Sequence, residues 1–313
     1  MSLSRSLLLP SVTEILQMAG FRTSQRCDVR PRSFDIVAKN DRDTLLLKVL
    51  YNIDAVNQEM AEELKRITKH LLASPLVVGE RMKGRFLETG VLYRRYGIPS
   101  MNVETLYDYF VEEIKIYAYS ERGGLYVKID GDAIKRARLK MGLSVGDLSK
   151  MIGVSRRSIS RYEENLMETT VSNAIELQET LGEDILTPID PLSMKPPLIN
   201  EKELNLDVLH LMSEIGFEVH PTPQAPFDAI SEDRDRTKIL TGSGKKVSSV
   251  RKRAKIMSSI SYVTGTMSAI IIEERSKEEN IENTAILEEK EVEKISNTDE
   301  FLKLLLSRAG SHR

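Results

Sequence analysis

The sequence is poor in the residues that bind soft metals or form cross-links. Its 313 residues include one cysteine, Cys27, and four histidines that lie far apart in the chain. A single cysteine excludes a disulfide within the chain and a zinc site built from several thiolates. The histidines lack ligand spacing, so we expect neither a metal nor another cofactor, although carboxylates could still bind magnesium.

Long apolar runs are also missing. No stretch approaches the roughly 18 to 20 apolar residues of a membrane-spanning helix, and the first ten residues hold no apolar run long enough for export. We therefore expect a cytoplasmic protein without membrane contact. The content of 41% hydrophobic and 29% charged residues is typical of a folded protein, and the length fits two or three domains.

Two segments interrupt the regular patterns. Residues 120–124 end in two glycines, and the prolines Pro188, Pro191, Pro196 and Pro197 crowd the region that follows residue 187. Both segments are unfavourable for helix interiors and central strands. We expect domains at 1–120, 125–190 and 198–313.

The middle domain has the pattern of short helices. Residues 132–140 place apolar side chains at three- and four-residue spacing, and Gly142 can end this helix in the left-handed conformation. Ser144 with Asp147 three residues later is typical of a helix N-terminus, and Gly153 ends this second helix. Ser155 is expected to cap a third helix over residues 156–164.

The third helix carries side chains that suit DNA recognition. Ile159 and Tyr162 are expected in the core, whereas the basic and hydroxyl side chains face outwards. Arginine forms paired hydrogen bonds with guanine edges, serine donates to bases or phosphates, and helix N-termini favour phosphate. Between residues 132 and 162 eight Lys and Arg stand against two Asp, in a chain of net charge −2. The predicted DNA-binding residues are Ser144, Lys150, Ser155, Arg156, Arg157, Ser158, Ser160 and Arg161.

The run 134–165, followed by a helix predicted over 171–181, resembles the Cro and phage-repressor type of helix-turn-helix, the XRE class. The Gly142-Leu143-Ser144 and Gly153-Val154-Ser155 turns fall in the register of that family. Val145 departs from it, since many members have a phosphate-contacting glutamine there, and Ser149 replaces a small alanine. The resemblance implies that residues 156–164 enter the major groove of double-stranded DNA, and one short recognition helix per chain favours a homodimer. A packing module with a solvated basic face is the alternative.

The outer domains resemble each other. Gly20 matches Gly216, at a separation of 216 minus 20, or 196, and Asp35 matches Asp228, at 228 minus 35, or 193. Such a constant separation favours a duplicated unit over chance. Each copy is predicted to form a helix, three short strands, a long helix, two further strands and a last helix, which is a mixed α/β fold.

This order of elements resembles the restriction-endonuclease-like core of Holliday-junction resolvases and RecB-type nucleases. In such enzymes, the resemblance implies, an acidic residue of the first helix, a strand Asp and a Glu-x-Lys pair hold magnesium and activate water. Glu14, Asp35 and Lys48 fall at these places in the first copy, but Leu46 occupies the Glu position.

The second copy departs further from the nuclease pattern. His210 stands opposite Glu14, Asp228 is kept, and Thr241 is expected where the first copy has Lys48. We interpret Glu14, Asp35, Lys48 and Asp228 as vestigial positions and both copies as non-catalytic, because a lone Asp holds magnesium poorly.

Two features of the outer domains leave alternatives open. A carboxylate from Glu59 or Glu63 could restore a metal site in the first copy, which keeps a magnesium-dependent, structure-selective nuclease in view. Residues 245–255 carry six positive charges and no negative one. They form either a phosphate-contacting surface or a solvated helix face that pairs with the acidic residues between Glu273 and Glu293.

The whole chain resembles a small archaeal family of helix-turn-helix transcriptional regulators. The predicted fold is α/β plus all-α, with two α/β domains flanking a Cro-type bundle. The predicted function is sequence-specific DNA binding without catalysis, with the α/β domains as the dimerising parts. The alternatives are the nuclease, which predicts nicking lost on Asp35→Ala, and a DNA-repair adaptor, which predicts binding without sequence preference. The resemblance identifies no small-molecule effector.

Overall fold

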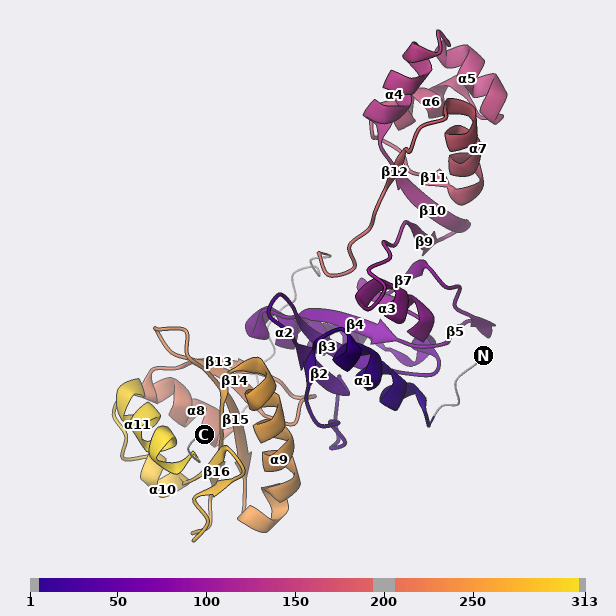
Figure 1. Cartoon of the computed structure of the whole chain (residues 1–313). Helices are drawn as coiled ribbons and strands as arrows, with labels where there is room; N and C mark the ends of the chain where they lie inside the picture. The colour runs from indigo at the N-terminus through magenta and orange to yellow at the C-terminus, as the bar shows by residue number, and fades with distance from the viewer. Residues whose placement is uncertain (1–5, 194–205, 310–313) are drawn as a thin grey trace.

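The computed structural model describes residues 6–193 and 206–309 and shows three units along the chain (Figure 1). A first α/β unit lies at the centre, a helical bundle extends from one side of it, and a second α/β unit lies at another side. The α/β plus α composition expected from the sequence is therefore confirmed. Pro196, Pro197 and the expected domain limits at 1, 198 and 313 lie outside the described residues. Within those residues, no helix is long and apolar enough to cross a membrane.

The first unit is built on a mixed sheet. Its elements are α1 (Leu8–Met18), β1 (Arg22–Thr23), β2 (Ile36–Lys39), β3 (Thr44–Val49), η1 (Ile53–Ala55), α2 (Gln58–Leu71), β4 (Ser74–Val78), β5 (Arg81–Met82), β6 (Arg85–Phe86), β7 (Val91–Arg95), β8 (Ile98–Met101) and α3 (Val103–Phe110). The sheet order is β1-β2-β3-β4-β8-β7, with β3, β4 and β8 parallel. The apolar run Leu76–Val78 forms a central strand buried on both faces, as a parallel strand requires.

The second unit repeats this topology. Its elements are α8 (Asp207–Ile215), β13 (Glu218–Pro221), β14 (Ala229–Glu232), β15 (Lys238–Gly244), α9 (Val247–Thr264), β16 (Met267–Ile272), β17 (Asn280–Ile281), β18 (Thr284–Glu288), α10 (Glu289–Val292) and α11 (Thr298–Arg308). The sheet order β13-β14-β15-β16-β18-β17 has the same strand directions as the first sheet. This agreement supports the duplicated unit that the sequence indicates.

The two α/β units share one hydrophobic core. Buried Phe34 and Leu46 of the first unit and Phe227 and Leu240 of the second belong to a single cluster, and α9 packs against β2. The opposite faces of the two sheets have separate cores, covered by α1 and α3 in one unit and by α8, α10 and α11 in the other. The two copies are therefore paired within one chain, through the faces that carry α2 and α9.

Polar contacts follow the same seam between the copies. The imidazole of His70 in α2 stacks on that of His220 in β13, with ring centroids 3.6 Å apart. The backbone N–H of Ser33 donates to the carbonyl of Gln224 at 2.8 Å, and the Lys39 ammonium donates to the carbonyl of Thr264 at 2.8 Å. Main-chain contacts of this kind fix the register of one copy on the other.

The bundle is connected to the first sheet through paired strands. Its elements are β9 (Ala118–Glu121), β10 (Gly124–Ile129), α4 (Gly131–Lys140), α5 (Val145–Ile152), α6 (Arg156–Glu163), β11 (Thr169–Thr170), α7 (Val171–Leu181) and β12 (Leu186–Thr187). Strand β9 pairs in parallel with β7, and β10 pairs with β9, β11 and β12. Residues 120–124, expected as a break, instead form the end of the β9–β10 hairpin, with Arg122 and Gly123 as its turn and positive φ angles at Gly123 and Gly124. The sheet therefore runs without interruption from the first unit into the bundle.

Candidate nucleic-acid interface and the cleft beside Asp35

Local capping interactions set the geometry of the bundle. The Ser144 hydroxyl donates to the Asp147 carboxylate at 2.6 Å and accepts the Asp147 backbone N–H, which completes a capping box. Gly153 ends α5 with φ 71°, in the left-handed region, and the Ser155 hydroxyl accepts the Ser158 backbone N–H at 3.0 Å to begin α6. The helix-turn-helix predicted from these residues is confirmed, within one residue at the end of α6.

One face of α6 is exposed. Ile159 and Tyr162 are buried in the bundle core, as expected, whereas Arg156, Arg157 and Arg161 are exposed. Ser158 and Ser160 are half-buried, and Lys150 of α5 is exposed. Figure 1 shows the bundle at the end of the molecule farthest from the second α/β unit. The expected DNA-contacting face is therefore open in a single chain.

The exposed basic side chains differ in their contacts within the chain. Arg157 forms no hydrogen bond or ion pair with any described residue, and the same is true of Lys150. Arg161 donates to the carbonyl of Leu166 at 3.3 Å, which ties it to the turn after α6. The Arg156 guanidinium lies against the start of α5, where its Nε is 3.0 Å from the place that a Cβ on Gly146 would occupy. Gly146 thus leaves room for a cation beside the free N–H groups of α5.

Part of the positive charge in the bundle is internal. The Arg138 guanidinium is nearly buried and donates to both carboxylate oxygens of Glu163 and to the carbonyl of Leu143. Lys140 pairs with exposed Glu183 at 3.3 Å. These two cations are balanced locally, so the charge available to a duplex comes from the other six basic residues of the segment, which include Arg156, Arg157 and Lys150.

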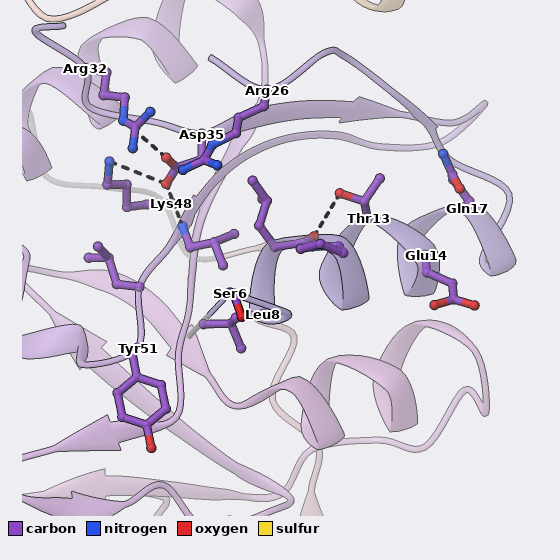
Figure 2. A pocket seen from close by; sticks show the side chains of 14 residues that line it. Ser6, Leu8, Thr13, Glu14, Gln17, Arg26, Arg32, Asp35, Lys48 and Tyr51 are labelled. Carbon is purple, nitrogen blue, oxygen red and sulfur yellow. Dashed lines mark hydrogen bonds and ion pairs between the residues drawn. The ribbon is translucent and has the colours of Figure 1, made fainter. Parts of the chain in front are cut away.

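A cleft of about 1100 Å³ marks the place of the nuclease-like centre in the first unit. Asp35, at the start of β2, accepts the Val49 backbone N–H at 2.9 Å and lies 3.4 Å from both the Lys48 Nζ and the Arg32 Nε. Figure 2 shows both cations joined to Asp35 by dashed lines, while Glu14 on α1 points away from it. Burial lowers the pKa of Lys48, and the neighbouring Asp35 carboxylate opposes that shift.

The residues of the cleft do not fit a divalent cation. Magnesium needs several oxygen donors, but both oxygens of Asp35 face cations and Glu14 is turned away. Leu46, at the position of the missing Glu, is fully buried in the shared core. The described residues include no group of three or more His, Cys, Asp or Glu that could hold a metal ion.

Neither carboxylate on α2 restores that donor set. Glu63 is 1% exposed, pairs with Arg66 and accepts the Gln224 backbone N–H at 3.2 Å, so it faces the second copy. Glu59 is not among the residues that line the cleft. The proposed migration of a metal carboxylate from Glu59 or Glu63 is therefore not supported by the geometry.

The second copy has a different cation beside the equivalent carboxylate. Asp228 accepts the Ser243 backbone N–H at 2.6 Å, just as Asp35 accepts that of Val49. This register places Gly242, and not Thr241 as expected from the sequence, opposite Lys48. The Arg253 Nη2 lies 3.0 Å from the Asp228 carboxylate and 3.3 Å from where a Cβ on Gly242 would be. An arginine from α9 thus pairs with Asp228, as Lys48 of β3 pairs with Asp35 in the first copy.

Three of the six basic residues in the run 245–255 form ion pairs inside the molecule. Arg253 holds Asp228, Lys252 lies 2.6 Å from Asp28 of the first copy, and Arg251 pairs with Glu278. The pairing with the acidic residues between 273 and 293 is confirmed for Arg251. The run belongs to α9 and the segment before it; Lys252 joins the two copies, whereas Arg251 and Arg253 pair within the second copy. Sequence reasoning missed the roles of Arg32 and Arg253, since the partner of each is set by tertiary structure.

Comparisons with known proteins agree with this architecture. A model of the PD-(D/E)XK superfamily domain matches residues 5–116, and a helix-turn-helix model matches residues 134–186. No solved structure matches the chain. Fold and capping geometry together define an XRE-type helix-turn-helix protein with a PD-(D/E)XK unit.

Relatives match over almost the full length. A protein of Methanosarcina acetivorans is 42% identical over 99% of both chains, and one of Archaeoglobus fulgidus is 42% identical over 96% of this chain and 98% of its own. One of Halorubrum lacusprofundi is 39% identical over 98% of both chains. Each is named "Putative HTH-type transcriptional regulatory protein". The chain belongs to this archaeal family of helix-turn-helix regulators.

Proposed function

We propose that the chain is a sequence-specific transcriptional regulator that places α6 in the major groove of DNA and acts without catalysis. The observation that carries the proposal is the position of Arg157, which is exposed on α6 and forms no hydrogen bond or ion pair within the described residues. Its guanidinium is free to form paired hydrogen bonds with a guanine edge. The names of the relatives and the poor fit of the cleft to magnesium also support this proposal.

Three of the exposed cations have two proposed roles, one in base reading and two in phosphate contact. Arg157 reads bases, because it lies on the open side of α6. Arg156 lies beside the N-terminus of α5, where the free N–H groups already favour phosphate, so we assign it to the DNA backbone. It would take the part of the glutamine that Val145 replaces in this family. Lys150, exposed on the same helix, is assigned to a phosphate as well.

Arg157→Ala is expected to reduce the preference for the operator over unrelated DNA by about 10- to 100-fold, since one paired base contact contributes roughly 1–3 kcal/mol. Arg156→Ala and Lys150→Ala are expected to weaken binding to all DNA sequences alike. Each should also reduce the slope of log affinity against log salt concentration by about one, because one phosphate contact is lost. Selection from random duplexes, followed by titration at several salt concentrations, measures both effects.

The matched control is Arg122→Ala, which removes an exposed arginine from the β9–β10 turn. It should leave operator preference unchanged. Equal losses for Arg157→Ala and Arg122→Ala, or binding by the parent chain without any sequence preference, would contradict the proposal. The second result is the one that the adaptor alternative predicts.

We also propose a homodimer, because a single α6 covers one half-site and a second helix one turn away, about 34 Å along the duplex, doubles the contact. The faces that carry α2 and α9 are already paired within each chain, so the dimer must use another surface. Light scattering of the full chain with and without operator DNA tests this state. A monomer in both conditions, with a single half-site footprint, would remove the dimer from the proposal.

A further inference from the structure

We propose that the cleft between α1 and β3 binds a small organic molecule through a phosphate group. The cleft has a volume of about 1100 Å³, which is ample for a ligand of the size of a nucleotide. Arg26, Arg32 and Lys48 line it together with Asp35 and Glu14. Nothing in the role of α6 in DNA reading requires this cluster, and it lies in a different unit of the molecule (Figures 1 and 2).

The floor of the cleft has an excess of positive charge. One carboxylate, Asp35, is shared by the Lys48 ammonium and the Arg32 guanidinium, each 3.4 Å away. Lys48 is an almost fully buried ammonium, with 5% of its side chain exposed, and Asp35 is the sole ion-pair partner that it has among the described residues. An ammonium has three donors, so two of them can still be satisfied by acceptor oxygens.

A further cation completes a site for an anion. Arg26 lines the cleft and forms no hydrogen bond or ion pair with any described residue. Figure 2 shows it on the same side of the cleft as Asp35, whereas the carboxylate of Glu14 points away. A phosphate group has several oxygens that can accept hydrogen bonds from Lys48 and Arg26. Arginine recognises phosphate through paired hydrogen bonds.

The remaining lining favours a small molecule over a duplex. Leu8, Leu9, Leu50 and Tyr51 add apolar and aromatic surface next to the basic groups. Ser6, Thr13 and Gln17 add uncharged polar groups, and concave sites that combine apolar walls with placed polar groups are typical of small-ligand pockets. A DNA phosphate on the convex surface of a duplex would have to reach an ammonium that is almost fully buried.

The test uses the full chain and two phosphate monoesters, glycerol 3-phosphate and adenosine 5′-monophosphate, with inorganic phosphate as a third probe. Isothermal titration is performed at constant ionic strength without magnesium. We expect saturable binding of at least one monoester, tighter than that of inorganic phosphate. Arg26→Ala should weaken it about tenfold, as expected for the loss of a charge-assisted hydrogen bond, and Lys48→Met should abolish it. Arg42→Ala, an exposed arginine of the β2–β3 turn outside the cleft, is the matched control and should have no effect.

The substitution Asp35→Asn distinguishes a phosphate site from a nuclease centre by the direction of its effect. The amide oxygen can still accept the Val49 N–H, so the fold is kept, while the loss of the negative charge should strengthen phosphate binding about fivefold or more. A magnesium-dependent nuclease centre would lose function on the same change. Absence of saturable binding by every probe, equal affinities for Arg26→Ala and Arg42→Ala, or weaker binding by Asp35→Asn would each overturn the proposal. So would displacement of the monoester by a short unrelated duplex, which would assign the site to DNA.

Discussion

Glu163→Ala is expected to destabilise the helical bundle strongly while both α/β units keep their stability. The change leaves the Arg138 guanidinium, with 8% of its side chain exposed, without the carboxylate that accepts two of its hydrogen bonds. Removal of one partner of a buried ion pair costs about 3–5 kcal/mol, because the other charge stays buried and unpaired. Domains are stable by roughly 5–15 kcal/mol, so this loss is large for a small bundle.

Hydrogen exchange measures this result directly. Protection should fall throughout α4 to α7 and persist in β3, β4 and β16, and operator binding should fall with it. The matched control is Glu164→Ala, at the exposed neighbouring position, which should leave protection and operator binding unchanged. The double variant Arg138→Met with Glu163→Leu should regain most of the protection, since it removes both charges. Full protection in Glu163→Ala would show that the pair contributes little to the bundle.

The bundle could be predicted from sequence because its signals are local. Ser144, Asp147, Gly153 and Ser155 each act on a backbone group a few residues away, so their spacing alone fixes where helices begin and end. The core positions Ile159 and Tyr162 follow from helical periodicity in the same way. The first helix, the three strands and the long helix of both α/β units were also predicted correctly, since apolar runs and breaks along the chain define them. The prediction of two strands and one helix after the long helix was wrong, because the described residues form five strands there in the first unit and three strands with the additional helix α10 in the second.

The partners of Asp35 and Asp228 could not be predicted from the sequence. The hydrogen bond from the Ser243 backbone N–H to Asp228 fixes the register that places Gly242 opposite Lys48. The sequences of the two copies are too dissimilar to define that register to within one residue. Arg253 lies on the following helix, so no spacing rule pairs it with Asp228. Tertiary structure also explains why a leucine stands at position 46, in the core that the two copies share. A nuclease active site would place an acid there, but a buried face between two copies favours a leucine.

The seam between the copies predicts a loss of stability in weak acid. Burial, and secondarily the neighbouring His220, lowers the pKa of His70 from 6.5 to about 3. An unfolded chain therefore binds a proton at His70 between pH 6.5 and 3 while the folded chain does not. Stability is fully present above pH 6.5 and falls with pH below it, by about 1.4 kcal/mol per unit and about 2 kcal/mol in total by pH 5.

Urea unfolding at pH 8, 6 and 5 measures this slope. His70→Phe keeps an aromatic ring against His220 and removes the titrating group, so its stability should change less between pH 8 and 5, by about 2 kcal/mol. His210→Phe, at an exposed position on α8, should retain the full slope. The comparison is restricted to pH 5 and above because carboxylates titrate below that range. Identical slopes in His70→Phe and the parent chain would mean that protonated His70 is accommodated in the folded seam, and that the two copies are not packed as tightly there as the ring stacking indicates.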